Sequence, residues 1–538
     1  MASLPLMLDF AFVNGLVFTG STERSRRDVG VTGDRIVTVA ERGALTEIGP
    51  ATEVVDLGGR LLTPGFIDAH VHPVTGGLKL NKCSLFDLEG VEAALTAVAA
   101  YAASHLDEPW IWGGGWALNW FPNGTPPAEL LDRVVSDRPV LLHNKDGHGA
   151  WVNTKALELA GIDRSTPDPP DGRIERLPDG SAQGTLHEGA VDLAERLYPP
   201  PDAMTWLQAL LTGQRFLHSF GITGWQDADV RSHDRRAYMD AVAAGLLTAR
   251  VVGAQWWERD RGREQIDEFE HNRRTTVGNF RQTSVKLMLD GIAENYTASM
   301  LDPYMDADGA GTANRGIDFI DPNDLPGIVT ELDSRGFQCH FHAIGDRAVR
   351  SALDAVEAAR AVNGVNDLRH HIAHLQVVDR GDHPRFAGLG VTANAQPLWA
   401  QHEPQMDELT LPFLGPERGG RQYPFASLVR AGAGLAMGSD WSVSTPDVMA
   451  QAQIAVHRRE ADGPEPFLPD ECLTLDQVLA AFTAGSAYVN HIDNEVGSIR
   501  PGMLADIAIL SADPFELEDL AEVEVDLTMV GGQVVHRR

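Results

Sequence analysis

Residues 65–72 read GFIDAHVH, a short apolar run that ends in two histidines two positions apart. In a β-strand residues i and i+2 face the same way, so His70 and His72 should project together from the end of this strand. Seven further apolar runs follow, separated by stretches with helical periodicity, at 222–228, 250–255, 284–290, 337–344, 369–376, 391–397 and 434–441. Strands that alternate with helices favour a parallel sheet, and eight of them predict an α/β fold, a distorted (β/α)8 TIM barrel.

The two chain ends have a different pattern from this middle region. Over 1–64 and 491–538, short alternating segments are broken by Gly, Asn and Asp, which is typical of antiparallel strands. We expect both ends to pair into one small β-sandwich beside a barrel that covers 65–490. The stretch at about 105–200 is more chain than the first βα unit needs and is rich in Trp, Pro and Gly. We expect it to be an insertion that covers the barrel mouth.

Composition and charge narrow the classes of partner. The 538 residues carry 76 Asp and Glu against 44 Lys and Arg, a net charge of −32 that would repel phosphate backbones and anionic lipid heads. We therefore expect a small-molecule substrate, with no nucleic acid and no membrane partner. A homo-oligomer is compatible with the sequence, which does not fix the oligomeric state.

The cellular compartment is indicated by the cysteines and the first residues. The three cysteines, at positions 83, 339 and 472, are far apart and form no disulfide framework or CxxC pair, which fits a reducing cytoplasm. The opening MASLPLMLDFAFVNG has no basic start and carries Asp9 inside its apolar run, so we do not expect a signal peptide. No stretch is apolar enough to span a bilayer. We expect a cytoplasmic protein.

Other polar residues end the remaining predicted strands, the place where TIM barrels carry catalytic groups. The candidates are Lys286, His342, His374 and Asp440. Burial disfavours an ammonium group, so the neutral amine of Lys286 becomes accessible and could take up CO2 as a carbamate. The alternative for Lys286 is an inward ion pair with Asp290 or Glu294.

The histidines and the aspartate also have alternative interpretations. His340 and His342 face the same way in their strand, and we choose His342 as the candidate ligand. His370 and His371 compete in the same manner with His374. Asp440 lies in a Gly-Ser-Asp turn, where it could instead be a turn residue or a helix cap.

Two residues near the expected mouth are candidate substrate contacts. His148, in KDGHGAW of the insertion, could reach the substrate or an oxyanion, or could be a structural hydrogen bonder. Trp441 directly follows Asp440 and is the tryptophan best placed to touch a substrate. The tryptophans of this region could instead pack the insertion onto the barrel. Glu188 in GTLHEGA is a further candidate contact.

The order HxH, Lys, His, His, Asp over consecutive strands is the pattern of the amidohydrolase superfamily. The segments LLTPGFIDAHVH, DGHGAWVNTKAL, HAIGDRAV, GSDWSV and GSIRPGMLADIAIL resemble its YtcJ-like (amidohydrolase 3) branch, and the resemblance spans nearly the whole chain. One departure is Ala373, where the branch commonly carries a glutamate before the histidine that corresponds to His374. The hydrogen bonds that this glutamate would make around His374 are therefore not expected here.

The resemblance implies one or two divalent metals. His70, His72 and Asp440 would hold one metal, His342 and His374 would hold the other, and a carbamate on Lys286 would bridge them. Imidazoles and oxygen anions suit Zn2+, although Mn2+, Co2+ or Fe2+ could occupy such a site. Asp440 would also act as general base and then general acid.

The implied activity is hydrolysis of a carbon–nitrogen, amide-type bond of a small molecule by metal-activated water. Two alternatives stay open. The same site could hydrolyse esters or lactones or act as a deaminase, or the chain could be a metal-free regulatory or interaction protein. The presence of every ligand type argues against the last.

Overall fold

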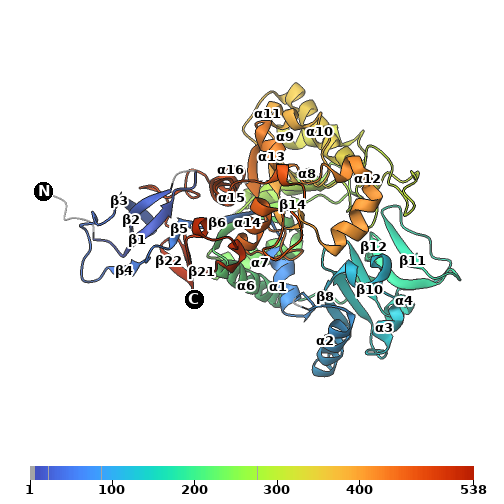
Figure 1. Ribbon diagram of the computed structural model, residues 1–538. Helices are drawn as coiled ribbons and strands as arrows, with labels where there is room; N and C mark the ends of the chain where they lie inside the picture. The colour runs from blue at the N-terminus through green and yellow to red at the C-terminus, as the bar shows by residue number, and fades with distance from the viewer. Residues whose placement is uncertain (1–6, 22–23, 87, 276) are drawn as a thin grey trace.

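The computed structural model describes residues 7–21, 24–86, 88–275 and 277–538 (Figure 1). Residues 1–6 lie outside the described residues. They are the first residues of the predicted β-sandwich part at 1–64 and of the segment that was considered as a signal peptide. The described chain forms three sheets, one central and two flanking.

The central sheet is the predicted barrel. Its eight strands run in the order β19-β18-β17-β16-β15-β14-β13-β6, and all the paired neighbours are parallel. The strands are β6 (Phe66–Val71), β13 (Ile222–Val230), β14 (Arg250–Trp256), β15 (Phe280–Met288), β16 (Gln338–Ala343), β17 (His371–His374), β18 (Thr392–Ala395) and β19 (Gly434–Met437). Each overlaps one of the eight predicted runs, with β15 beginning four residues earlier than predicted, so the predicted fold class is confirmed.

The barrel is closed just beyond β19, where the chain meets β6. The Asp440 N–H donates to the His70 carbonyl over 2.7 Å, and the His72 N–H donates to the Trp441 carbonyl over 2.6 Å. Gly438 allows this close approach, because a Cβ on it would lie 2.4 Å from the His70 nitrogen. The first and last strands therefore meet at the residues predicted to carry the chemistry.

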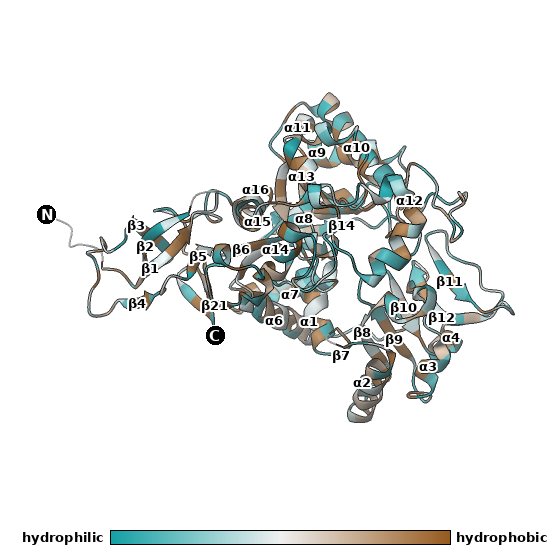
Figure 2. Cartoon of the chain, in the orientation of Figure 1, coloured by the Kyte–Doolittle hydropathy of each residue, from teal (hydrophilic) through white to brown (hydrophobic). Residues whose placement is uncertain are grey.

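Helices cover the outside of the barrel because each has one apolar face. On α10 (Asp346–Asn363), Val349, Leu353 and Val356 are fully buried at spacings of four and three, whereas Asp354 and Glu357 on the opposite side are exposed. Figure 2 shows this mixture of hydrophobic and hydrophilic residues on α10 and its neighbour α9 (Leu325–Ser334). The other principal covering helices are α1 (Pro73–Leu80), α6 (Ala203–Ser219), α7 (Ser232–Ala243), α8 (Gln265–Arg274), α11 (His383–Leu389), α13 (Phe425–Arg430), α14 (Val448–His457), α15 (Leu475–Ala480) and α16 (Ser486–Val489).

Both chain ends join one flanking sheet, as their alternating pattern predicts. Its order is β22-β21-β20-β5-β1-β2-β3, with β4 paired to β1, and β5 and β20 join the two ends antiparallel. The strands are β1 (Phe10–Phe18), β2 (Arg24–Thr32), β3 (Arg35–Glu41), β4 (Glu53–Asp56), β5 (Leu61–Pro64), β20 (Ile507–Leu510), β21 (Val525–Val530) and β22 (Gln533–Arg537). Phe12, Val29, Ile507 and Met529 share its core.

A third sheet, of six strands, follows the first barrel strand and extends from residue 83 to residue 188, so it begins before the predicted insertion at about 105–200. It comprises β7 (Cys83–Ser84), β8 (Ile111–Trp116), β9 (Val140–Asn144), β10 (Gly149–Val152), β11 (Gly172–Arg176) and β12 (Ala182–Glu188), with α2 (Val91–Ser104), α3 (Ala128–Asp132) and α4 (Thr154–Ala160) against it. Trp116 and Trp151 share a buried cluster with Ile292 and Ile344 from barrel loops. These two tryptophans therefore attach the insertion to the barrel.

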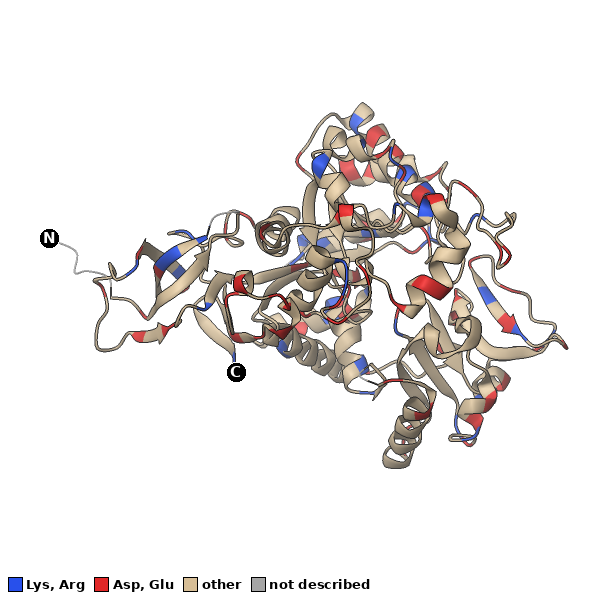
Figure 3. Cartoon of the chain, in the orientation of Figure 1, with Lys and Arg blue, Asp and Glu red and all other residues tan. Residues whose placement is uncertain are grey.

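Charged side chains are distributed over the outer helices and loops, including α9, α10 and α12 (Leu411–Gly419), as Figure 3 shows. Within the described residues, no helix combines the length and the apolar composition needed to cross a membrane.

Candidate metal centre

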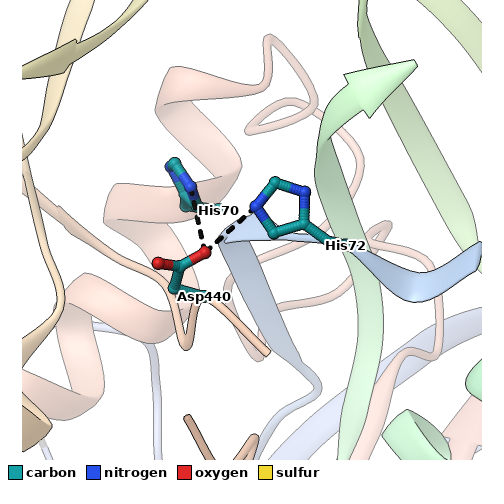
Figure 4. Close-up of side chains that lie close together, drawn as sticks. All are labelled: His70, His72 and Asp440. Atoms are coloured by element: carbon teal, nitrogen blue, oxygen red, sulfur yellow. Dashed lines mark ion pairs between the residues drawn. The ribbon is translucent and has the colours of Figure 1, made fainter. Parts of the chain in front are cut away.

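Three predicted ligands meet where the barrel closes (Figure 4). His70 and His72 lie at the carboxyl end of β6, and Asp440 lies three residues beyond β19. Asp440 Oδ1 is 3.3 Å from His70 Nε2 and 3.0 Å from His72 Nε2. One possible ligand atom from each residue falls within 4.8 Å of the others. This spacing is suited to a single cation.

The electrostatics of this cluster fit a divalent metal. Burial lowers the pKa of His70 to about 3, so its imidazole is neutral. Although burial alone would raise the pKa of Asp440, the adjacent His70 and His72 hold it well below its usual range, so the carboxylate is ionised. Asp440 Oδ1 and His374 Nδ1 are buried without a well-formed hydrogen bond to any described residue. Buried polar atoms normally have a partner, and a cation would supply it.

Lys286 lies on β15 beside this cluster. Its Nζ is 3.4 Å from His70 Nε2, and burial lowers the pKa of the amine to about 8, with Asp440 opposing the shift. The alternative partners are engaged elsewhere. Asp290 accepts from the backbone N–H groups of Ser299, Ile344 and Gly345, and Glu294 accepts from the Thr410 hydroxyl. Lys286 is therefore not held by the alternative ion pair.

His342 and His374 complete the group on the neighbouring strands β16 and β17. Their ring centroids are 4.5 Å apart, and His374 Nδ1 is 4.0 Å from Asp440 Oδ2. Burial lowers the pKa of both rings. His374 and Asp440 adopt left-handed backbone conformations, with φ of 76° and 55°, which are uncommon for residues other than glycine. The six predicted ligands thus share one end of the barrel.

The competing histidines occupy a deeper layer of the barrel. His340 is fully buried with its Nε2 2.8 Å from His70 Nδ1, so it can orient the His70 ring through the nitrogen that faces away from Asp440. His371 Nε2 lies 2.9 Å from the Gln226 amide oxygen, and His370 Nε2 lies 3.0 Å from Asp333. These three rings do not line the pocket. The His342 ring does line it, and its Nδ1 lies 3.2 Å from Asp290 Oδ1.

Sequence reasoning missed a positioning role for Asp68. Its carboxylate accepts from the backbone N–H groups of His70 and Ser439, each over 3.0 Å, and from the Ser439 hydroxyl over 2.5 Å. It therefore ties β6 to the segment that carries Asp440. The available signal was an acidic residue inside the apolar run FIDAHV, facing the same way as His70.

A pocket opens above the ligands and encloses about 510 Å³, its mouth included. Its lining residues are Asp146, His148, Ile292, Glu294, His342, Ile344, His374, Gln376, Trp399, Glu403, Gln405, Met406, Tyr423, Asp440 and Val443. The metal centre and a space for a small molecule are therefore continuous.

His148 reaches this pocket from the turn between β9 and β10. Its Nδ1 lies 3.1 Å from both oxygens of Glu188, which also accepts from Asn295 and Thr297. Although burial opposes a charge on the ring, Glu188 raises the pKa of His148 to about 9. An imidazolium therefore lies in the wall of the pocket, held by a carboxylate of the insertion.

Trp441 takes a different place from the one expected. Its indole is 5% exposed, packs on Phe216 of α6 with centroids 5.0 Å apart, and fills the space beside Gly76 of α1. It is not among the residues that line the described pocket. The space beside Gly76 holds the large ring, and the substrate contact of Trp441 stays a prediction. Trp399, 6.0 Å from the His374 ring, lines the pocket.

This arrangement, with imidazoles, a carboxylate and a lysine at the carboxyl ends of barrel strands, is that of a metal-dependent hydrolase. The chain belongs to the amidohydrolase family, whose model matches residues 53–536. The predicted family and enzyme class are thereby confirmed.

Individual relatives extend over almost the whole chain. The putative amidohydrolase YtcJ of Bacillus subtilis is 29% identical and covers 91% of each chain. An N-substituted formamide deformylase of Arthrobacter pascens is 26% identical over 99% of each chain. The crystal structure of an uncharacterized metal-dependent hydrolase from Pyrococcus horikoshii has a TM-score of 0.73 at 22% identity, covering 95% of this chain and 98% of that one. This structural likeness concerns the fold.

Proposed function

We propose that this enzyme hydrolyses a carbon–nitrogen, amide-type bond of a small molecule. The observation that carries the proposal is the cluster of His70, His72 and Asp440 beside an open pocket that Asp440 also lines. These residues would hold one Zn2+, and His342 and His374 would hold a second, with Lys286 between them as a carbamate. Mn2+, Co2+ or Fe2+ suits the same donors. When bound, such a metal activates water and polarises the carbonyl under attack.

Asp440 is the proposed proton carrier. Its carboxylate is ionised and lies at the pocket, so it can accept a proton from the attacking water and deliver it to the leaving nitrogen. Both steps need a carboxylate that approaches the reacting atoms from a fixed direction. Its backbone bond to His70 supplies that fixed position.

His148 is the proposed stabiliser of the substrate oxygen. Glu188 engages its Nδ1, so Nε2 is left to donate to a group in the pocket. A partly buried cationic donor aimed at developing negative charge lowers the barrier more than it would in water. The name of the relative from Arthrobacter pascens favours N-acyl or formamide-like compounds as the substrate class.

The test combines metal analysis with substrate profiling. Purified protein should hold between about one and two equivalents of divalent metal, the number that two half-sites allow. Chelation should abolish the hydrolysis of N-substituted formamides, and added Zn2+ should restore it. The double variant His70→Ala/His72→Ala should lose metal, whereas the exposed control His105→Ala should keep it.

Each result separates the proposal from an alternative. A preference for esters, lactones or amino-substituted heterocycles over amides would replace the proposed bond by one of the other reactions. Less than about a tenth of an equivalent of metal after growth with added zinc would contradict the proposal and favour a regulatory role.

A further inference from the structure

Three carboxylates that the proposed chemistry does not use line the same pocket. Asp146 lies in the turn between β9 and β10, Glu294 lies in the segment after β15, and Glu403 lies just before the helical turn η4 (Gln405–Thr410). They come from three separate parts of the chain and converge on one space. Trp399 and Met406 add apolar surface to it.

These carboxylates have little compensation from the protein. Within the described chain, none of the three forms an ion pair with a lysine or arginine. Asp146 accepts a hydrogen bond from the His148 backbone N–H over 2.9 Å, and Glu294 accepts one from the Thr410 hydroxyl over 2.8 Å. A nearby cation, the His148 imidazolium, lies 3.1 Å from Glu188 and also opposes the rise in the pKa of Asp146, so it is shared between two carboxylates. The pocket therefore has an excess of acidic groups over basic ones.

All three residues are partly buried, which makes this arrangement unfavourable without a ligand. Burial raises the pKa of Asp146, of Glu294 and of Glu403, the last to about 7, with Lys145 opposing and Glu294 reinforcing the shift at Glu403. A buried carboxylate is stabilised as an anion when a cation comes close. A positively charged ligand would relieve this cost at the carboxylates that it approaches.

The spacing of the carboxylates favours an organic cation over a second metal centre. In the described part of the chain, the only group of three or more metal-type ligand atoms within 4.8 Å of one another is that of His70, His72 and Asp440. Asp146, Glu294 and Glu403 are thus spread along the wall and do not surround one point. An ammonium or amidinium group on an apolar stem fits such a wall, and Trp399 offers a ring face for it.

We propose that this pocket selects substrates that carry a protonated amine or amidinium group away from the bond to be cleaved, with Glu294, Glu403 and Asp146 as the specificity-determining residues. The inference names the substrate class of the proposed amide hydrolysis and therefore rests on that function. The acidic wall binds the cationic end of the molecule, and the metal centre receives its amide.

The test measures binding without turnover, so that the two proposals can fail separately. Metal-loaded protein is titrated in a calorimeter with phenethylammonium and with 2-phenylethanol, which have closely similar size and shape but differ in charge. We expect phenethylammonium to bind about tenfold or more tightly, as a buried charge-assisted contact predicts. Equal affinity for the two probes would overturn the inference, and it would leave amide hydrolysis untouched.

Variants locate the source of the preference. Glu294→Gln/Glu403→Gln keeps the shape of the wall and removes two charges, so the preference should fall by about tenfold. Glu408→Gln, an exposed change five residues beyond Glu403, should leave it unaltered. An unchanged preference in the double variant would refute the inference, because the amine would then be bound elsewhere, for example by the metal. An equal loss in Glu408→Gln would also refute it, since the effect would then come from the net charge of the protein.

Discussion

Replacing Asp440 by asparagine separates its role in moving a proton from its role in holding a metal. Asp440 Oδ1 lies 3.3 Å from His70 Nε2 and 3.0 Å from His72 Nε2, and the amide oxygen of asparagine can take the same position. The two histidines stay in place, so most of the metal should be retained. The proton acceptor is lost, and turnover should fall by about 10²–10⁴-fold, as is typical for removal of acid–base catalysis. This corresponds to about 2.7–5.4 kcal/mol of barrier.

The assay measures kcat on an N-substituted formamide and metal content on the same preparation. Asp354→Asn, an exposed change of the same kind on α10, serves as the control and should match the parent in both measurements. Wild-type turnover in Asp440→Asn would refute the mechanism. Parallel loss of metal and activity would instead assign Asp440 chiefly as a ligand, and another group such as His148 would move the proton.

Three further predictions test other parts of the structure. Lys286→Ala should lose activity and part of the metal, and short carboxylates should restore activity; full activity without them, measured by the same assay, would contradict the carbamate. Glu188→Gln should shift the alkaline fall of kcat/KM to lower pH. Glu188 raises the pKa of His148 to about 9, so the imidazolium is present below that pH and is lost above it, and removing the carboxylate charge should lower this pKa. An identical pH profile in the variant would remove His148 from catalysis. Leu353→Ala should lower the free energy of unfolding by about 2–5 kcal/mol through the cavity left in a fully buried site, and a denaturation midpoint equal to that of Asp354→Ala would disprove this packing.

Much of the barrel could be predicted because its strands are short apolar runs that end in polar residues. The same local rule placed His70 and His72 on one face, since side chains alternate along a strand. It could not choose between His340 and His342, which share a face. The structure distinguishes them, because the His340 ring contacts the His70 ring below the site and His342 lines the pocket.

Features that depend on distant parts of the chain escaped sequence reasoning. The extra sheet begins at β7, well before residue 105, where the insertion was expected to begin. The sequence did not reveal this strand, because it has two residues and no periodicity of its own, and it is recognised only by its pairing with β8. Trp441 follows Asp440 in the chain, yet its ring turns toward α1 and α6. The Trp441 ring fits there because residue 76, 365 positions earlier in the chain, is a glycine without a side chain.

The hydrogen bond between His70 and Asp440, which closes the barrel, has a consequence for the folding of the enzyme during synthesis. The two residues are 370 positions apart, and the hydrogen bond that joins them also brings the ligands together. During synthesis the amino-terminal half of the site emerges from the ribosome long before its partner exists. A cation that bound the finished cluster would join the first strand to the last and stabilise the closed barrel by mass action. Metal supply would then govern the lifetime of the newly made protein as well as its activity.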